Sequence, residues 1–238
     1  MPSTIYLIPS LLDENASNVL PAYIVEAVKD CQVFFVEDER SARRFLKKIW
    51  KEMVIDDYEW FVANKTTIMQ PDINHVFRSK LKEDKNIGII SEAGCPGVAD
   101  PGQPLVAIAH SMGATIKPLV GPSSILLALM ASGMNGQQFS FTGYLPIDTA
   151  ERIKALRDLE NESARKNTTQ IFMETPYRND QLLETIIKTC RPSTKLCIAA
   201  NLTGKNEFIQ TRTIEDWKKK LPVLHKQPVI FLIHSQGT

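Results

Sequence analysis

Short apolar runs alternate with longer amphipathic stretches along the first half of the chain. The apolar runs at residues 4–8, 32–36, 87–90 and 115–120 predict buried strands. Helical periodicity follows at residues 18–29, after residue 39, at 71–82 and at 104–112. Strands that alternate with helices across short loops favour a parallel sheet.

The pattern changes after Gly133, where predicted strands follow one another more closely and at hairpin-like spacing. They lie at residues 138–144, 170–174, 195–200, 207–211 and 228–234, with helices at 125–132, at 148–166, up to residue 190 and at 214–220. We therefore predict an α/β fold of two domains. Residues 1–119 form an N-terminal domain with a parallel sheet, and residues 120–238 form a C-terminal domain with a mixed sheet.

Residues 56–67 fit neither period. Their aromatic side chains, Tyr58, Trp60 and Phe61, are compatible with the core or with a substrate-binding face, and we favour the core.

Composition narrows the function classes. The formal net charge of +1 argues against a strongly basic nucleic-acid module, although a local basic face can still bind RNA. The four cysteines are scattered without metal-ligand spacing, which predicts reduced thiols in a cytoplasmic protein and no metal site. We expect no signal peptide, and no apolar run approaches the roughly 18 residues of a membrane span.

The stretch at residues 87–106 is the strongest candidate site. An apolar strand enters a loop rich in glycine and proline, and a helix follows. This order builds ligand sites at the carboxyl end of a strand, since glycine lets a ligand approach the backbone. We predict that the loop holds a small cofactor, S-adenosylmethionine. Two roles suit the turn Gly121-Pro122-Ser123-Ser124 equally well. It can bind a ligand carboxylate or ribose, or it can be an ordinary helix cap.

Acidic residues follow the second predicted strand. Asp38 and Glu39 are candidates for a functional rim, and they equally suit a solvated helix N-terminus, where acids complement the helix dipole. No Gly-x-Gly-x-x-Gly follows the first strand and no P-loop is present in the sequence, which disfavours a nucleotide-binding dehydrogenase and a P-loop enzyme.

Four segments together resemble one family. They are VEDERSARRFL at 36–46, ISEAGCPGVADPGQPLV at 90–106, VGPSSILLALMASGMNGQQFSFTGYLP at 120–146 and FMETPYR at 172–178. The chain resembles the tetrapyrrole methylase superfamily of S-adenosylmethionine-dependent methyltransferases. Within it, the chain is most similar to the branch that methylates a cytidine 2′-hydroxyl in small-subunit ribosomal RNA. The resemblance implies a cofactor cleft between the two domains, a homodimer and ribosomal RNA as partner.

The resemblance also assigns roles to individual residues. Those matched to cofactor binding are Pro9, Ser91, Gly94, Cys95, Pro96, Val98, Ala99, Pro122, Ser123, Ser124, Met173, Ala200 and Asn201. Substrate-binding candidates are Arg40, Arg43 and Arg44, with Glu174 and Arg178, which form either a substrate contact or an ion pair that locks a turn. Deprotonation of a ribose hydroxyl requires a base or a neighbour that stabilises the charge. Candidates for this role are Asp38, Glu39 and Asp100.

The chain differs from the family's pattern at several matched positions. Glu92 stands where the family has Asp, and Cys95 where it has Thr. Ala200, Asn201 and Gly204 replace the Arg, Glu and Lys usual in the RNA-methylating branch. Two further readings therefore stay open: a methyltransferase for a tetrapyrrole or another small substrate, and a non-catalytic cofactor-binding relative.

Overall fold

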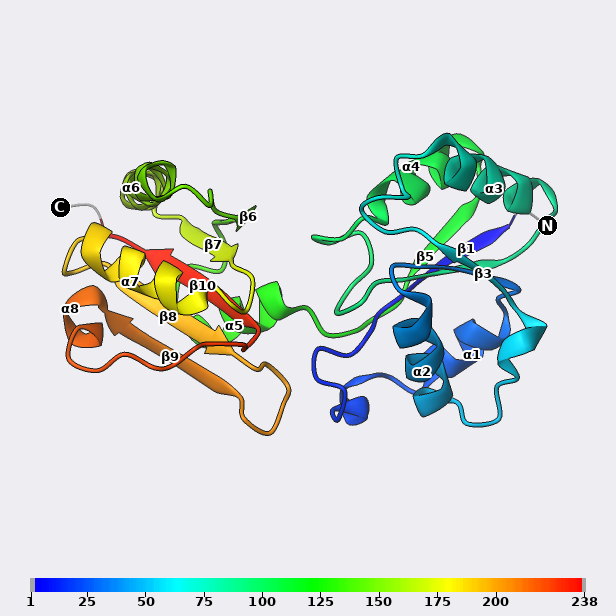
Figure 1. Ribbon diagram of the computed structural model, residues 1–238, viewed down its shortest axis with the longest axis horizontal. Coiled ribbons are helices and arrows are strands. Elements are labelled where there is room, and N and C mark those ends of the chain that lie inside the picture. The colour runs from blue at the N-terminus through cyan, green and yellow to red at the C-terminus, as the bar shows by residue number, and fades with distance from the viewer. Residues whose placement is uncertain (1–2, 237–238) are drawn as a thin grey trace. The chain divides into compact units, whose positions relative to one another are not determined.

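The computed structural model describes residues 3–236, and the chain divides into two compact units (Figure 1). Unit 1 comprises Met1–Ser123 and unit 2 comprises Ser124–Thr238. The domain boundary after residue 119 that the sequence suggests stays a prediction.

Unit 1 contains a five-stranded sheet in which every paired strand is parallel, in the order β3-β2-β4-β1-β5. Its strands are β1 (Thr4–Ile8), β2 (Val33–Val36), β3 (Glu59–Val62), β4 (Ile87–Ile90) and β5 (Thr115–Pro118). Its helices are α1 (Tyr23–Lys29), α2 (Glu39–Ile49), α3 (Pro71–Lys82) and α4 (Gln103–Ser111), with short 3₁₀ turns at Ser17–Val19 and Ile55–Asp57. This confirms the parallel sheet that the alternating pattern predicts.

Helices cover both faces of this sheet because successive strand residues point to opposite sides. In β2, Val33 and Phe35 pack towards α3 and α4, where Phe77 and Leu105 lie. Phe34 and Val36 pack on the other face towards α1 and α2. All four side chains of β2 are buried, which explains why the strand reads as a continuous apolar run.

Unit 2 contains a mixed five-stranded sheet in the order β6-β7-β10-β8-β9. Its strands are β6 (Phe139–Tyr144), β7 (Thr169–Met173), β8 (Lys195–Ala200), β9 (Phe208–Thr213) and β10 (Val229–His234), and its helices are α5 (Ser124–Ser132), α6 (Thr149–Lys166), α7 (Asn179–Thr189) and α8 (Ile214–Trp217). β6 and β7 are parallel, whereas β10 is antiparallel to both β7 and β8. The predicted mixed sheet is confirmed.

The core of unit 2 lies between this sheet and α6 and α7. Phe172 of β7 stacks on Phe231 of β10 with ring centroids 6.0 Å apart, and Leu156 and Leu182 of the two helices belong to the same buried cluster. Each unit therefore has its own hydrophobic core.

The strand β3 is the main element that the sequence did not predict. Its residues are only partly buried, as suits the edge of the sheet. Trp60 stacks on Phe34 at 4.8 Å and Phe61 on Phe35 at 5.1 Å between ring centroids. The preference for a core role of these aromatic residues is thus confirmed.

Candidate active site

The loops that follow β1, β2, β4 and β5 leave the same edge of the unit 1 sheet. These strands are parallel, so their carboxyl ends lie on one side. In doubly wound α/β folds this edge is where ligands bind. The residues after these strands are therefore the candidates for a functional site.

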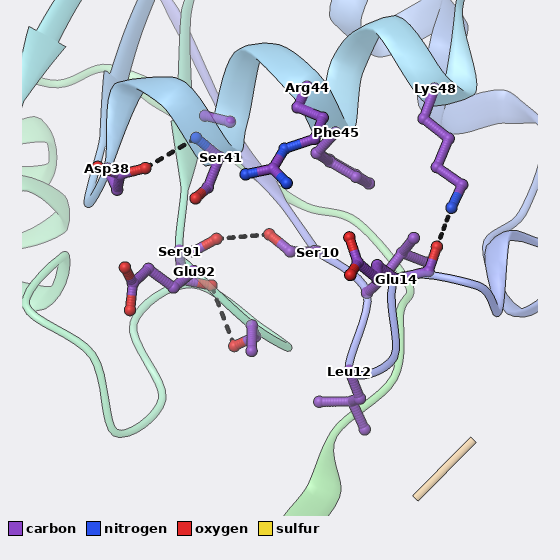
Figure 2. Close-up of a pocket in the computed structure, with 13 residues that line it drawn as sticks. Ser10, Leu12, Glu14, Asp38, Ser41, Arg44, Phe45, Lys48, Ser91 and Glu92 are labelled. Atoms are coloured by element: carbon purple, nitrogen blue, oxygen red, sulfur yellow. Dashed lines mark hydrogen bonds between the residues drawn. The ribbon is translucent and has the colours of Figure 1, made fainter. Parts of the chain in front are cut away.

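Two serines join the first of these loops to the third. The Ser10 amide donates to the Gly94 carbonyl at 2.8 Å, and the Ser10 hydroxyl donates to the Ser91 carbonyl at 2.5 Å (Figure 2). Ser10 and Ser91 are both buried, so these bonds are protected from water. The loop after β1 is thereby held against the start of the loop after β4.

Close backbone packing adds the loop after β5. A Cβ on Gly121 would lie 2.2 Å from the Cβ of Pro9, so only glycine fits there. The Cys95 thiol donates to the Pro122 carbonyl at 3.5 Å, and burial raises the pKa of that thiol. Cys95 therefore stays a neutral thiol, which suits a structural residue of the loop and not a nucleophile.

Asp100 braces the glycine-rich loop from inside. Its carboxylate accepts hydrogen bonds from the amides of Gly97 at 2.6 Å and Gly102 at 3.0 Å. Burial raises the pKa of Asp100, while these two bonds act in the opposite direction. Between them Ala99 adopts a left-handed conformation with φ of 60°. Asp100 is thus occupied in holding the loop, and its predicted catalytic role stays a prediction.

A pocket of about 450 Å³ opens beside these loops (Figure 2). It is lined by Ser10, Leu11, Leu12, Glu14, Asp38, Ser41, Ala42, Arg44, Phe45, Lys48, Ser91, Glu92 and Ala93. Three residues predicted from the sequence are brought together here: Asp38, Arg44 and Ser91. Gly94, Cys95, Pro96, Val98, Ala99 and Pro122 belong to the adjoining loops and do not line it.

Asp38 has a structural task at the entrance of α2. It is the N-cap of the helix, and its carboxylate accepts from the Ser41 amide at 2.7 Å. Hydrogen bonds from Ser41, followed by the nearby Arg40 and Arg44, hold the pKa of Asp38 below its usual value. A carboxylate with a lowered pKa is a weaker base, so the cap interpretation gains support over the catalytic one.

Glu39 does not line the pocket, because it pairs with Arg43. Their Oε1 and Nη2 atoms lie 2.6 Å apart, and the Arg43 guanidinium lies 5.1 Å from the centre of the Trp60 ring. Arg40 is exposed on the first turn of the helix. Of the three predicted arginines, Arg44 alone lines the pocket.

Glu92 is a pocket residue that the sequence did not single out as catalytic. Its pKa is raised by partial burial and then by the neighbouring carboxylates of Glu37 and Asp38. The Glu92 amide also donates to the Glu37 carboxylate at 3.2 Å. The signal in the sequence is its position just after a buried strand, whereas the resemblance marks Glu92 only as a departure from the family's Asp.

The remaining predicted residues lie in unit 2 at one edge of its sheet. Met173 ends β7 opposite Ile230, and Ala200 ends β8 opposite Val229, so both lie beside the start of β10. Asn201 follows in a left-handed conformation with φ of 51°, and its side-chain amide donates to the side-chain oxygen Oε1 of Gln227 at 2.6 Å.

Glu174 and Arg178 form an ion pair, which is one of the two roles that the sequence analysis gives them. Arg178 Nη2 lies 2.6 Å from Glu174 Oε1, and the Glu174 side chain is fully buried. Glu174 Oε2 and Arg178 Nε are buried without a hydrogen-bond partner among the described residues. The ion pair is confirmed, and a substrate contact stays a prediction.

Within residues 3–236, no three side chains of His, Cys, Asp or Glu gather closely enough to hold a metal ion. Over the same residues no helix has the length and apolarity needed to cross a bilayer.

Comparison with known proteins gives a consistent picture. Residues 20–218 match the family of Tetrapyrrole (Corrin/Porphyrin) Methylases. The ribosomal RNA small subunit methyltransferase I of Vibrio cholerae is 32% identical over 67% of this chain and 55% of its own length. The protein of the same name from Micromonospora olivasterospora is 30% identical over 89% of this chain and 64% of its own length. The alignments thus span between about half and two thirds of these relatives.

Solved structures share the fold at low identity. The methyltransferase CobJ superposes with a TM-score of 0.64 at 16% identity, over 98% of this chain and 93% of the other. A uroporphyrin-III C-methyl transferase from Thermus thermophilus, complexed with S-adenyl homocysteine, gives a TM-score of 0.57 at 14% identity, over 98% of each chain. These likenesses confirm the fold class.

Proposed function

Because the chain belongs to the tetrapyrrole methylase family, we propose that it is an S-adenosylmethionine-dependent methyltransferase. The acceptor we propose is the 2′-hydroxyl of a cytidine ribose in small-subunit ribosomal RNA. The name that the curated relatives share supports small-subunit ribosomal RNA as the substrate, and the cytidine 2′-hydroxyl rests on the resemblance described in the sequence analysis. The structural observation that carries the proposal is that residues 91–93 both begin the braced glycine-rich loop and line the 450 Å³ pocket. A site for a methyl donor and a site for its acceptor would then adjoin.

The glycine-rich loop fits the proposed cofactor. Gly97 has a φ of 81°, and a Cβ built on it would meet nothing within 4 Å, so its backbone is open to a ligand. The carboxylate and ribose of S-adenosylmethionine need backbone amides and hydroxyls rather than charges. We assign its binding in unit 1 to the backbone of residues 94–99 and to the turn at Pro122 and Ser123. The resemblance also assigns Met173, Ala200 and Asn201 of unit 2 to the cofactor, and this assignment stays a prediction.

Methyl transfer requires the protein mainly to position the two reactants. When bound, S-adenosylmethionine supplies an electrophilic methyl group on a sulfonium. Transfer is an in-line displacement, whose rate depends on holding the acceptor oxygen in line with the methyl group. The bonds from Ser10 to Ser91 and Gly94, and from Asp100 to the loop amides, keep the loop rigid enough for that task.

A ribose hydroxyl is a poor nucleophile until its proton is removed. Among the pocket carboxylates, Asp38 caps a helix and has a lowered pKa, whereas Glu92 has a raised pKa and no side-chain hydrogen bond within residues 3–236. We therefore place the general base at Glu92 in preference to Asp38, Glu39 or Asp100. A base with a pKa nearer the working pH transfers protons more efficiently.

The proposed assembly rests on the same resemblance, and the proposed location rests on the scattered cysteines. We propose a homodimer in the cytoplasm with the small ribosomal subunit as partner. Sedimentation of the purified chain tests the dimer, and a monomer at micromolar concentration would contradict it.

Two measurements test the function. Titration of the purified chain with S-adenosylmethionine should release heat and raise the melting temperature. Absence of both effects at millimolar cofactor would overturn the cofactor assignment. Deletion of the gene, followed by mapping of ribose methylation on ribosomal RNA, should reveal one missing cytidine methylation that the purified protein restores. An unchanged map would overturn the assignment of ribosomal RNA as the acceptor. The remaining alternatives would be a methyltransferase for a small molecule and a non-catalytic relative.

A further inference from the structure

The basic residues of α2 fall on two faces of the helix. Positions 40, 44 and 48 follow one another at four-residue spacing, as do 43 and 47, and residues at this spacing share a face. Arg44 and Lys48 line the pocket, whereas Arg43 does not. The face that carries position 44 is thus the one turned towards the loops after β1 and β4.

Arg44 also differs from its neighbours in what it contacts. Arg43 pairs with Glu39, and the Lys47 ammonium donates to the carbonyls of Lys51 and Met53. The Lys48 ammonium donates to the Glu14 carbonyl. The Arg44 side chain forms no hydrogen bond or ion pair with any other of residues 3–236. Its guanidinium points from α2 into the pocket, on the side of Ser10 and Ser91 (Figure 2).

The rest of the lining has a mixed character. Carboxylates of Glu14, Asp38 and Glu92 and hydroxyls of Ser10 and Ser41 share the pocket with Arg44. Three carboxylates disfavour a bare anion such as phosphate, because they would repel it. A ligand that carries an anionic group together with hydroxyl and amino donors, as a ribonucleotide does, suits this lining better, since carboxylates accept hydrogen bonds from such donors. The volume of about 450 Å³ lies within the range of small-molecule sites.

We propose that this pocket takes one nucleotide of the RNA acceptor and that Arg44 binds its phosphate. The guanidinium can donate two parallel N–H groups to phosphate oxygens, and a ribose fits beside the carboxylates and hydroxyls. This inference rests on the proposed function and makes it more specific. It assigns phosphate recognition to one arginine of α2, whereas the sequence offered Arg40, Arg43 and Arg44 alike.

The test compares cytidine 5′-monophosphate with cytidine as ligands of the full chain. The two differ only in the phosphate, so the ratio of their affinities isolates the phosphate contact. The variant is Arg44→Gln. The matched control is Arg78→Gln, because Arg78 is an exposed arginine of α3, outside the pocket and without a hydrogen bond or ion pair to the rest of residues 3–236. Measured melting temperatures should be close to that of the wild type for both variants, which checks that they are folded.

The wild type and Arg78→Gln should bind the monophosphate about tenfold more tightly than cytidine, and Arg44→Gln should lose that preference. With a small-subunit RNA fragment, Arg44→Gln should reduce the slope of log affinity against log salt by about 0.7. A preference retained in Arg44→Gln, or no nucleotide binding by the wild type, overturns the inference. So does a loss of S-adenosylmethionine affinity in Arg44→Gln with nucleotide binding intact, because the pocket then holds the methyl donor.

The same experiment separates this inference from the proposed acceptor. If nucleotide binding depends on Arg44 but the RNA methylation map does not depend on the gene, the pocket still binds a nucleotide through Arg44, and the assignment of ribosomal RNA as the acceptor fails.

Discussion

At the scale of single residues, the candidate site depends on backbone contacts that tolerate no added atom. Gly121 is the sharpest case, because its backbone lies directly against the ring of Pro9. A proline ring is rigid, so a methyl group at position 121 must push the loop after β5 away from the loop after β1. Such a shift also moves the Cys95 thiol away from the carbonyl of Pro122.

Gly121→Ala should therefore destabilise the protein by about 1–3 kcal/mol and weaken cofactor binding. Gly136→Ala is the control, since a Cβ there meets nothing within 4 Å and its φ is not left-handed. It should change stability by less than about 1 kcal/mol. Urea unfolding and calorimetric titration with S-adenosylmethionine give the two readouts. Equal stability of the two variants would show that the loops can separate without cost.

Glu92 ties the pH dependence of activity to that of stability. Its pKa in the folded protein is raised above 4.5. As pH rises through the window between 4.5 and the raised value, the unfolded chain loses its proton first, so stability falls. Over the same window the side chain becomes deprotonated, so a rate that needs it as a base rises.

Glu92→Gln should then raise stability at neutral pH by a few tenths of a kcal/mol, a small gain because the side chain is exposed. The gain should shrink as pH falls below the raised pKa. The rate should drop by about 10²-fold or more. Unfolding curves and methylation rates between pH 4.5 and 8 provide the comparison. Full activity in this variant would remove Glu92 from the mechanism.

At the scale of elements, α2 brings together structure and recognition. Its N-cap, Asp38, fixes where the helix begins, and the start of the helix decides which basic side chains reach the pocket. A loss of the cap would therefore disturb the direction of Arg44 as well as the end of the helix.

Asp38→Ala should cost about 1 kcal/mol of stability through the lost hydrogen bond to the Ser41 amide. Asp38→Asn keeps a capping oxygen and should cost less, while it removes the charge. If the Asn variant keeps its methylation rate and the Ala variant loses stability, Asp38 is a cap. A rate that falls equally in both variants at equal stability would make Asp38 catalytic. Thermal unfolding and rate measurements on both proteins decide between them.

The sequence predicted most elements because their patterns are local. β2 and β4 are buried on every residue and read as apolar runs. The sequence did not predict β3, because it is an edge strand whose residues are only partly buried. Its aromatic side chains also stack on Phe34 and Phe35, which lie far from it in the chain. The roles of Arg43 and Arg44 were indistinguishable for a similar reason, since only the packed helix shows which one faces the pocket. Asp100 looked like a possible base because the sequence does not show the two amides that its carboxylate binds. Those hydrogen bonds form only when the loop is folded.

At the scale of the whole molecule, each unit contains its own buried clusters. The clusters around Phe35 and Phe34 belong to unit 1, and the cluster around Phe231 belongs to unit 2. Both units have the size of ordinary small domains. The predicted organisation into two domains can thus be tested by separation.

We expect residues 124–238 to fold alone, with a cooperative thermal transition and dispersed amide NMR signals. Residues 1–123 should do the same, and neither fragment should methylate RNA, because our proposal uses residues of both units. A fragment without a cooperative transition would show that its core needs the other half of the chain.

The strand order of unit 1 has a consequence for the way the chain is made. β1 pairs with β4 and β5, which lie about 80 and 110 residues later in the chain. A ribosome that adds roughly 5–20 residues per second needs about 4–16 seconds to bridge the first of these gaps. During that time the apolar strand at residues 4–8 has emerged without a neighbour in its own sheet. The nascent chain thus presents an unpaired β-strand, and we expect its yield in cells to depend on translation speed and on chaperones that bind such segments.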